Sequence, residues 1–205
     1  MKHKRSLKML EQSILCALVI CIAFSMTSFA HSCETVSESV LRMHVIANSD
    51  SAEDQALKLK VRDAVLAAGA DIFDGSVTAE EAERKITPRI DELTCVAQET
   101  IAAEGFNYDV TVTVDQEYFN TRTYDDTVTL PAGMYHAVKV VIGEGAGQNW
   151  WCVMFPPMCL PAAENREGID AVLSGDEIKV VESSPEYEPR FKIVEWINQL
   201  KEKMA

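Results

Sequence analysis

Apolar and polar side chains alternate with two different periods after residue 40, and each period predicts a type of element. The segment 40–46 alternates imperfectly between apolar and polar residues, which predicts a strand, and a polar turn at 47–51 follows it. Apolar residues then recur at every third or fourth position, which predicts a helix that ends at Gly69. The residues of its apolar face are Leu57, Val61, Ala64, Val65 and Ala68.

Serine and threonine side chains mark the starts of the predicted helices. Ser51 precedes Asp54, and Thr78 precedes Glu81, at the spacing of a capping box. Pro88 then either kinks the second helix or starts a third one. The helical spacing continues from there to residue 101.

Three further segments predict strands. Residues 108–115 alternate between apolar and polar, which predicts a strand with one face exposed to solvent. Residues 135–142 are apolar on both faces near the end of the segment, as in a central strand. Residues 150–155 predict a third strand, which the prolines at 156 and 157 end. One face of it would carry Trp150, Cys152 and Met154, and the other Trp151, Val153 and Phe155.

The segment 189–205 predicts a C-terminal helix that packs on the sheet through Phe191, Val194, Ile197 and Leu200. Trp196 is expected in the core or at its rim, with a partner contact as the alternative. The order strand, helices, three strands and helix predicts the fold class α+β. We expect a single domain, with a mixed or mainly antiparallel sheet and helices packed chiefly on one face.

Residues 1–30 have the layout of a secretory signal peptide. Basic residues precede an unbroken apolar run of 11 residues, and small residues at 28 and 30 suit a cut after Ala30. The run is shorter than the roughly 18 apolar residues that span a bilayer, and an uncleaved anchor is the alternative. We therefore expect a signal peptide at 1–30 and a single secreted domain at 31–205.

The predicted secreted domain is strongly acidic. The leader carries four of the 19 basic and one of the 32 acidic residues, which leaves 15 basic and 31 acidic residues and a net charge of −16. Such a domain does not by itself attract nucleic acid or anionic lipid. We expect no nucleic acid partner, and membrane contact only through the export signal. The charge either serves solubility or presents an acidic face to a basic partner.

Four cysteines remain after the leader, and an even number outside the cytosol suggests disulfide bonds. Cys152 and Cys159 are close enough for a local bridge, which would contribute about 2.5 kcal/mol in the chain-entropy model. Their spacing is not the Cys-x-x-Cys of a redox site. Cys33 and Cys95 are the leftover pair, although we expect Cys33 in a loose N-terminal arm.

The glycine-rich run 143–147 precedes a predicted strand and not a helix, so it lacks the helix N-terminus that a phosphate loop needs. We predict a bend between two paired strands, with glycine supplying positive φ.

No catalytic or metal-binding motif is readable, and we expect no cofactor, no metal and no small-molecule substrate. The sequence has no His-Glu-x-x-His, Gly-x-Ser-x-Gly or Asp-Thr-Gly. Because His44 lies near Ser49 and Asp50, a secreted hydrolase with a site in the segment His44 to Asp50 is the alternative function. Asp50 needs only local hydrogen bonds to act as a helix cap or in an Asx-turn.

Two blocks carry a resemblance to a known family. "LRMHVIANSDSAEDQALKLKVRDAVL" at 41–66 and "LPAGMYHAVKVVIGEGAGQNWWCVMFPPMC" at 130–159, with the leader and the "YEPRFKIVEWI" tail, are similar to stage II sporulation protein R. The resemblance runs over most of the chain. The segments 71–128 and 160–185 match weakly and are interpreted from pattern alone.

The resemblance implies a secreted signalling protein of endospore formation that is not an enzyme. Such a protein is exported across the forespore membrane into the intermembrane space of the sporulating cell. There it activates a membrane-embedded stage II sporulation aspartic protease, which processes the precursor of the mother-cell sigma factor E.

The turn at 48–51 and the loop at 143–150 are the segments that we expect on one side of the domain, as its recognition face. The candidate partner-binding residues are Asn48, Asp50, Gln148, Asn149, Trp150 and Trp151. Tryptophan is a favoured interface anchor. The alternative is that Asp50 only caps a helix and that both tryptophans belong to the core.

Overall fold

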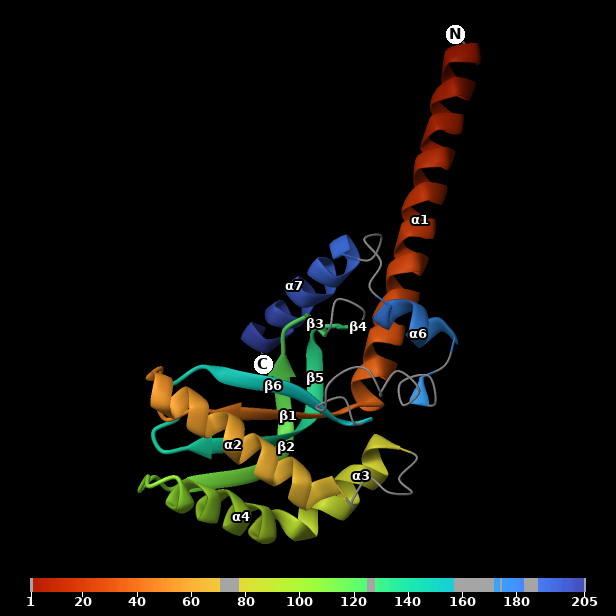
Figure 1. The fold of residues 1–205 in the computed structure, drawn as a ribbon. Coiled ribbons are helices and arrows are strands. Elements are labelled where there is room, and N and C mark those ends of the chain that lie inside the picture. Colours follow the sequence, from red (N-terminus) through yellow and green to blue (C-terminus); the bar gives the residue numbers. More distant parts are fainter. Residues whose placement is uncertain are drawn as a thin grey trace.

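A mixed four-stranded sheet lies at the centre of the fold in a computed structural model (Figure 1). The structure describes residues 2–70, 78–124, 128–156, 172–173, 175–182 and 188–204. In chain order the elements are α1 (Lys2–Glu38), β1 (Leu41–Ile46), α2 (Ala52–Gly69), α3 (Ala79–Ile86), η2 (Thr87–Arg89), α4 (Ile90–Ala103), β2 (Val110–Phe119), β3 (Arg122–Tyr124), β4 (Val128–Leu130), β5 (Gly133–Ile142), β6 (Asn149–Phe155), α6 (Gly175–Val181) and α7 (Glu188–Met204). The predicted α+β class is confirmed.

The strand order of the sheet is β2-β5-β1-β6. Strand β1 runs parallel to β5 and antiparallel to β6, while β2 and β5 are antiparallel. Both β5 and β1 are therefore interior strands, which agrees with the apolar character of 135–142 on both faces.

The predicted bend between paired strands is wrong in one respect, because β5 and β6 are not neighbours. Strand β1 lies between them, so the glycine-rich segment has to cross the end of β1. The expected positive φ is present at Gly143 (57°) and Gly145 (60°).

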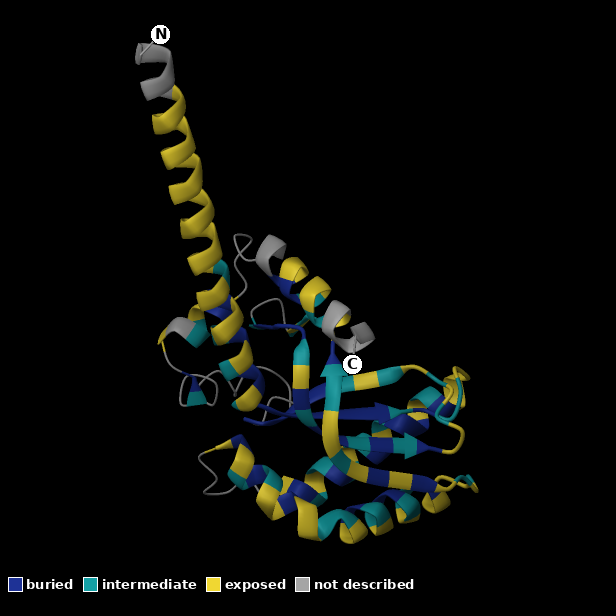
Figure 2. Cartoon of the chain, turned by 180° about the vertical axis from the view of Figure 1, so that it is seen from behind, coloured by how far each residue is buried: buried dark blue, intermediate teal, exposed yellow. Residues whose placement is uncertain are grey.

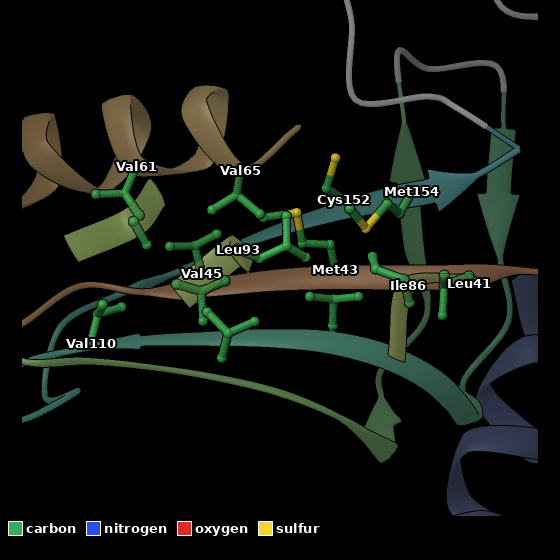
Figure 3. Close-up of a cluster of buried hydrophobic side chains, with 14 of the residues drawn as sticks. Leu41, Met43, Val45, Val61, Val65, Ile86, Leu93, Val110, Cys152 and Met154 are labelled. Carbon is green, nitrogen blue, oxygen red and sulfur yellow. The ribbon is translucent and has the colours of Figure 1, made fainter. Parts of the chain in front are cut away.

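Helices α2, α3 and α4 cover one face of the sheet and enclose the larger core (Figures 1 and 3). Met43 and Val45 of β1 point into this core and meet Val61 and Val65 of α2. The helix starts follow the capping signals: the side chain of Ser51 accepts a hydrogen bond from the backbone of Asp54, and that of Thr78 accepts one from Glu81. Pro88 lies in the short 3-10 turn from which α4 begins.

The opposite face of the sheet carries a second, smaller core. The end of α1, the two-stranded β3–β4 sheet and α6 contribute to it, and the sequence pattern predicted neither that sheet nor α6. Its buried members are Val36, Val40, Phe119, Leu130, Tyr135, Ala137, Val153, Leu173 and Val181. Helices therefore lie chiefly, but not exclusively, on one face.

Helix α1 is continuous from the leader into the domain. Phe29 and Cys33 are buried and pack with Val180, Phe191 and Val194 in a third cluster. The expected loose arm around Cys33 is therefore wrong, because that part of α1 is held by α6 and α7. The segment Lys8–Glu38 is long and apolar enough to cross a membrane.

Helix α7 packs on α1 and α6 through Phe191 and Val194, and among the described residues no member of the four-stranded sheet belongs to this cluster. Ile197 is 44% exposed and Trp196 is 73% exposed, so the predicted burial of both is wrong. Of the members whose side chains the structure describes, Phe191 and Val194 point inward and Ile197 does not. The side chain of Leu200 lies outside the described residues.

Candidate functional site

The turn after β1 and the loop between β5 and β6 lie against each other. We call residues 47–51 and 143–148 the paired loops. Four hydrogen bonds join them: Gly147 N to Ala47 O (2.9 Å), Ala146 N to Asn48 O (3.1 Å), Glu144 N to Asn48 Oδ1 (3.0 Å) and Gln148 N to Asp50 Oδ1 (2.7 Å). The two segments thus occupy one side of the domain, as expected. Their role in binding stays a prediction.

Glycine is required where the paired loops touch. A Cβ atom at Gly147 would lie 2.3 Å from the carbonyl oxygen of Ser49, and one at Gly143 would lie 2.3 Å from Oδ1 of Asn48. Both distances are far inside van der Waals contact. The glycines therefore allow close packing of one loop on the other, in addition to the left-handed backbone at Gly143.

Side chains from the first turns of α2 hold the paired loops in place through hydrogen bonds. Asp54 is 3% exposed, and its carboxylate accepts hydrogen bonds from Asn48 Nδ2 (2.9 Å) and from the hydroxyl of Ser49. Gln55 Nε2 donates to Ser49 O (2.9 Å), and the buried Lys58 donates to Gln148 O (2.9 Å). Sequence reasoning treated Asp54 only as a capping residue and did not assign Gln55 or Lys58 to the site.

The charge of Asp54 depends on these donors. Burial alone would raise the pKa of this carboxyl, but hydrogen bonds outweigh it and lower the pKa below its ordinary value. The donors are Ser49, Asn48, Tyr108 and Ser51. Asp54 is therefore a buried, hydrogen-bonded carboxylate on which the conformation of the first loop depends.

The candidate contact residues divide into two sets. Asn48, Asp50 and Gln148 come together in the paired loops, where Asp50 and Gln148 are exposed. Trp150 is 37% exposed and lies beside α2, with the guanidinium carbon of Arg62 4.4 Å from its ring centre. Asn149 is partly buried, and within the described part of the chain its Oδ1 has no hydrogen-bond partner.

Trp151 belongs to a different environment, on the opposite face of the sheet. Its indole stacks on the ring of His44, with ring centres 5.0 Å apart, and packs edge-on against Phe119. The fully buried Arg42 lies nearby, with its guanidinium carbon 3.9 Å from the centre of the Phe119 ring and a hydrogen bond to the hydroxyl of Tyr124. The two neighbouring tryptophans therefore cannot act as one anchor.

Arg42 and His44 contain buried polar atoms that have no hydrogen-bond partner among the residues that the structure describes. These are Nε and Nη1 of Arg42 and both ring nitrogens of His44. Burial lowers the pKa of Arg42 and lowers that of His44 to about 4. His44 is therefore neutral at physiological pH, while Arg42 is stabilised by aromatic rings and Tyr124. The alternating pattern of 40–46 placed both residues on one side of a strand but did not predict their burial.

The hydrolase alternative receives no support from this geometry. The hydroxyl of Ser49 donates to Asp54, and the ring nitrogens of His44 have no partner, so the two residues do not form a nucleophile–base pair. Among the residues that the structure describes, no group of three or more histidine, cysteine and acidic side chains could hold a metal ion.

Cys152 is disulfide-bonded, while Cys33 and Cys95 are free thiols. The predicted partner Cys159 lies outside the described residues, so the pairing of Cys152 with Cys159 stays a prediction. The leftover pair Cys33 and Cys95 is not joined, because Cys33 is buried beside α7 and Cys95 is exposed on α4.

Comparison with known proteins identifies the family. Residues 37–165 match the family model of stage II sporulation protein R. The chain belongs to the stage II sporulation protein R family. It is 33% identical over 186 residues to stage II sporulation protein R of Bacillus subtilis, an alignment that covers 80% of this chain and 83% of the relative. No solved structure matches the chain. The matched region of this family member includes the paired loops and the Arg42–His44–Trp151 group.

Replacing the buried carboxylate tests the role of Asp54. We expect Asp54→Asn to lower the free energy of unfolding by about 1–3 kcal/mol at pH 7, because hydrogen bonds to a charged acceptor are lost. Because the pKa of Asp54 is lowered in the folded state, its carboxylate stabilises the fold at pH values above the unfolded-state pKa of about 3.9. This contribution disappears as the pH falls through the folded-state pKa.

The difference between the two proteins should therefore shrink below about pH 4. Urea unfolding at several pH values measures it. Asp63→Asn is the control, since Asp63 is an exposed residue of the same helix and should change stability by less than about 0.5 kcal/mol. A pH-independent difference at Asp54 would contradict the assignment.

Thiol labelling tests the disulfide. In the native, oxidised protein we expect the exposed Cys95 to react while Cys152 and Cys159 stay unlabelled until a reductant is added. Cys95 thus serves as an internal positive control. Labelling of both Cys152 and Cys159 without reductant would show that they are not bonded.

Proposed function

We propose that this protein is an exported signal of endospore formation that activates a membrane-embedded stage II sporulation aspartic protease. The activated protease then processes the precursor of the mother-cell sigma factor E. The observation that carries the proposal is membership of the stage II sporulation protein R family over most of the chain. In this proposal the protein acts as a ligand and not as an enzyme, and it works in the space between the two membranes of the sporulating cell.

The N-terminal helix supports the export step. Its segment Lys8–Glu38 is long and apolar enough to cross a membrane. Basic residues at 2, 4, 5 and 8 precede the apolar run, as expected for a chain directed to the export machinery. The folded domain at the other end of the helix would then reach the intermembrane space.

We propose the paired loops, together with Trp150, as the surface that contacts the protease. The hydrogen bonds between the loops and from α2 hold this surface in one conformation before any partner arrives. A preorganised surface loses less conformational entropy on binding than a flexible one. Trp150 adds a partly exposed aromatic ring beside the exposed polar groups of Asp50 and Gln148.

The contacts of Asp50, Trp150 and Asn149 indicate what an alanine substitution at each position would remove. Asp50 uses a carboxylate oxygen to hold Gln148 N, so Asp50→Ala alters the loop conformation as well as its surface. Trp150→Ala removes surface that no strand hydrogen bond depends on, because the backbone pairing with Val45 remains. Asn149→Ala removes a side chain that is only partly buried.

Three alanine variants, at Asp50, Asn149 and Trp150, test the proposed surface. The full chain is produced together with the protease and the sigma factor precursor, and precursor cleavage, export and thermal unfolding are measured for each variant. We expect Trp150→Ala to reduce cleavage at least tenfold, the loss of about 1.4 kcal/mol of binding free energy, with normal export and an unchanged melting curve. Asp50→Ala should reduce cleavage and also lower stability by about 0.5–1.5 kcal/mol.

Two matched controls lie elsewhere on the sheet. Met134→Ala removes an exposed apolar side chain near the start of β5, and Asp115→Ala removes an exposed carboxylate from β2. Both should leave precursor cleavage unchanged. Normal cleavage by all three test variants would place the contact surface elsewhere, and losses of cleavage that follow losses of stability would assign these residues to folding alone.

A further inference from the structure

Helix α7 leaves an apolar stripe exposed. Ile193, Trp196 and Ile197 are 43%, 73% and 44% exposed, and their spacing places them on one side of the helix. The opposite side is buried through Phe191 and Val194, which pack on Phe29 and Cys33 of α1. We call Ile193, Trp196 and Ile197 the outer face of α7.

The outer face lies close to the part of α1 that suits a bilayer. Large apolar side chains of α1 are exposed from Met9 to Phe24, by 55% or more each. The first buried contact with α7 comes at Phe29, five residues beyond Phe24, which is about 7.5 Å along a helix. In both views α7 lies on the side of the domain from which the free part of α1 projects (Figures 1 and 2).

The thickness of a bilayer indicates the depth at which α7 would lie relative to the hydrocarbon core. A membrane-spanning helix needs about 20 residues, and the exposed apolar side chains of α1 begin at Met9, so a span counted from there ends near residue 28. The helix would therefore leave the hydrocarbon core within one turn of Phe29. At that depth lie the lipid headgroups, where tryptophan is enriched because its ring is apolar and its N–H is polar.

We propose that α1 stays attached as an anchor and that the outer face of α7 rests in the headgroup region of the membrane that α1 crosses. This goes beyond the proposed signalling function and adds a second membrane contact to the one expected from the leader. It also adopts the anchor alternative for residues 1–30. A cut after Ala30 would remove Phe29, whose ring centre lies 5.4 Å from that of Phe191, and would open the α1–α7 contact.

Apolar burial, and not charge attraction, drives this contact. The chain from residue 31 onward has a net charge of −16, which opposes binding to anionic lipid. The exposed Lys192 beside the outer face is already paired with Glu195. Zwitterionic phosphatidylcholine therefore suffices as the surface, and the contact should depend little on salt.

Fluorescence quenching by brominated lipid tests the proposal. The full chain is inserted in vesicles of ordinary phosphatidylcholine or of phosphatidylcholine brominated at a shallow acyl position. We expect part of the tryptophan emission to be quenched in the brominated vesicles and Trp196→Phe to abolish this quenched part. Trp150→Phe is the matched control and should leave it unchanged.

The combined Ile193→Gln and Ile197→Gln variant should reduce the quenching at least twofold with an unchanged melting curve. Equal emission in both kinds of vesicle, or quenching that survives Trp196→Phe, would overturn the membrane contact. A blue shift of Trp196 emission that grows with protein concentration would instead show that a second copy covers the outer face, and would also overturn it.

The intact mass of the exported chain tests the anchor separately. We expect the mass of the chain with residues 1–30 attached, and a chain that begins at His31 would overturn that part. None of these measurements uses precursor cleavage, so their failure is distinguishable from failure of the proposed signalling function.

Discussion

The position of β1 between β5 and β6 is the constraint on which the rest of the structure depends. Because β1 is parallel to β5 and antiparallel to β6, the chain that leaves β5 has to pass over the end of β1 to reach β6. That crossing places the glycine-rich loop against the turn that follows β1. The close contacts at Gly143 and Gly147, and the hydrogen bond between Asp50 and Gln148, follow from this crossing.

Strand β1 also separates two cores of different character. Met43 and Val45 face α2, α3 and α4 in an apolar core, while Arg42 and His44 face Phe119, Tyr135 and Trp151 on the other side. Burying an arginine costs several kcal/mol unless its charge is compensated. Here the aromatic rings and the hydroxyl of Tyr124 supply the compensation, while two guanidinium nitrogens have no hydrogen bond to any residue that the structure describes. Strand β1 thus carries Arg42 into the second core, and the other residues of that core have to compensate its charge.

The two surfaces that we propose, the outer face of α7 and the paired loops, would serve different tasks. Helices α1 and α7 form the side that we propose to face the membrane, and Phe29 and Phe191 hold these two helices together. The paired loops follow the ends of β1 and β5, and α2 holds them through Asp54 and Lys58. Two points of contact with a membrane restrict the orientation of a domain more than a single tether does. A signal held in this way would present its loops to a membrane-embedded protease at a restricted height and angle.

The sequence by itself determined the longer elements, the helix caps at Ser51 and Thr78, and the family. Local periodicity and the capping pairs at Ser51 and Thr78 depend on neighbouring residues only, so strand β1 and the starts of α2 and α3 were predictable. The motifs at 41–66 and 130–159 identified the family for the same reason, because they are contiguous stretches of chain.

Strand order, by contrast, was decided by the tertiary structure. An alternating pattern indicates which side chains of a strand share a face, but not which other strand is its neighbour in the sheet. The position of β1 between β5 and β6 could therefore not be predicted from the sequence. Strands β3 and β4 are three residues long, too short for a period to appear. The burial of Arg42 and the exposure of Trp196 depend on which elements cover each face. Only long-range packing decides that, because the same helical spacing is compatible with more than one inward side.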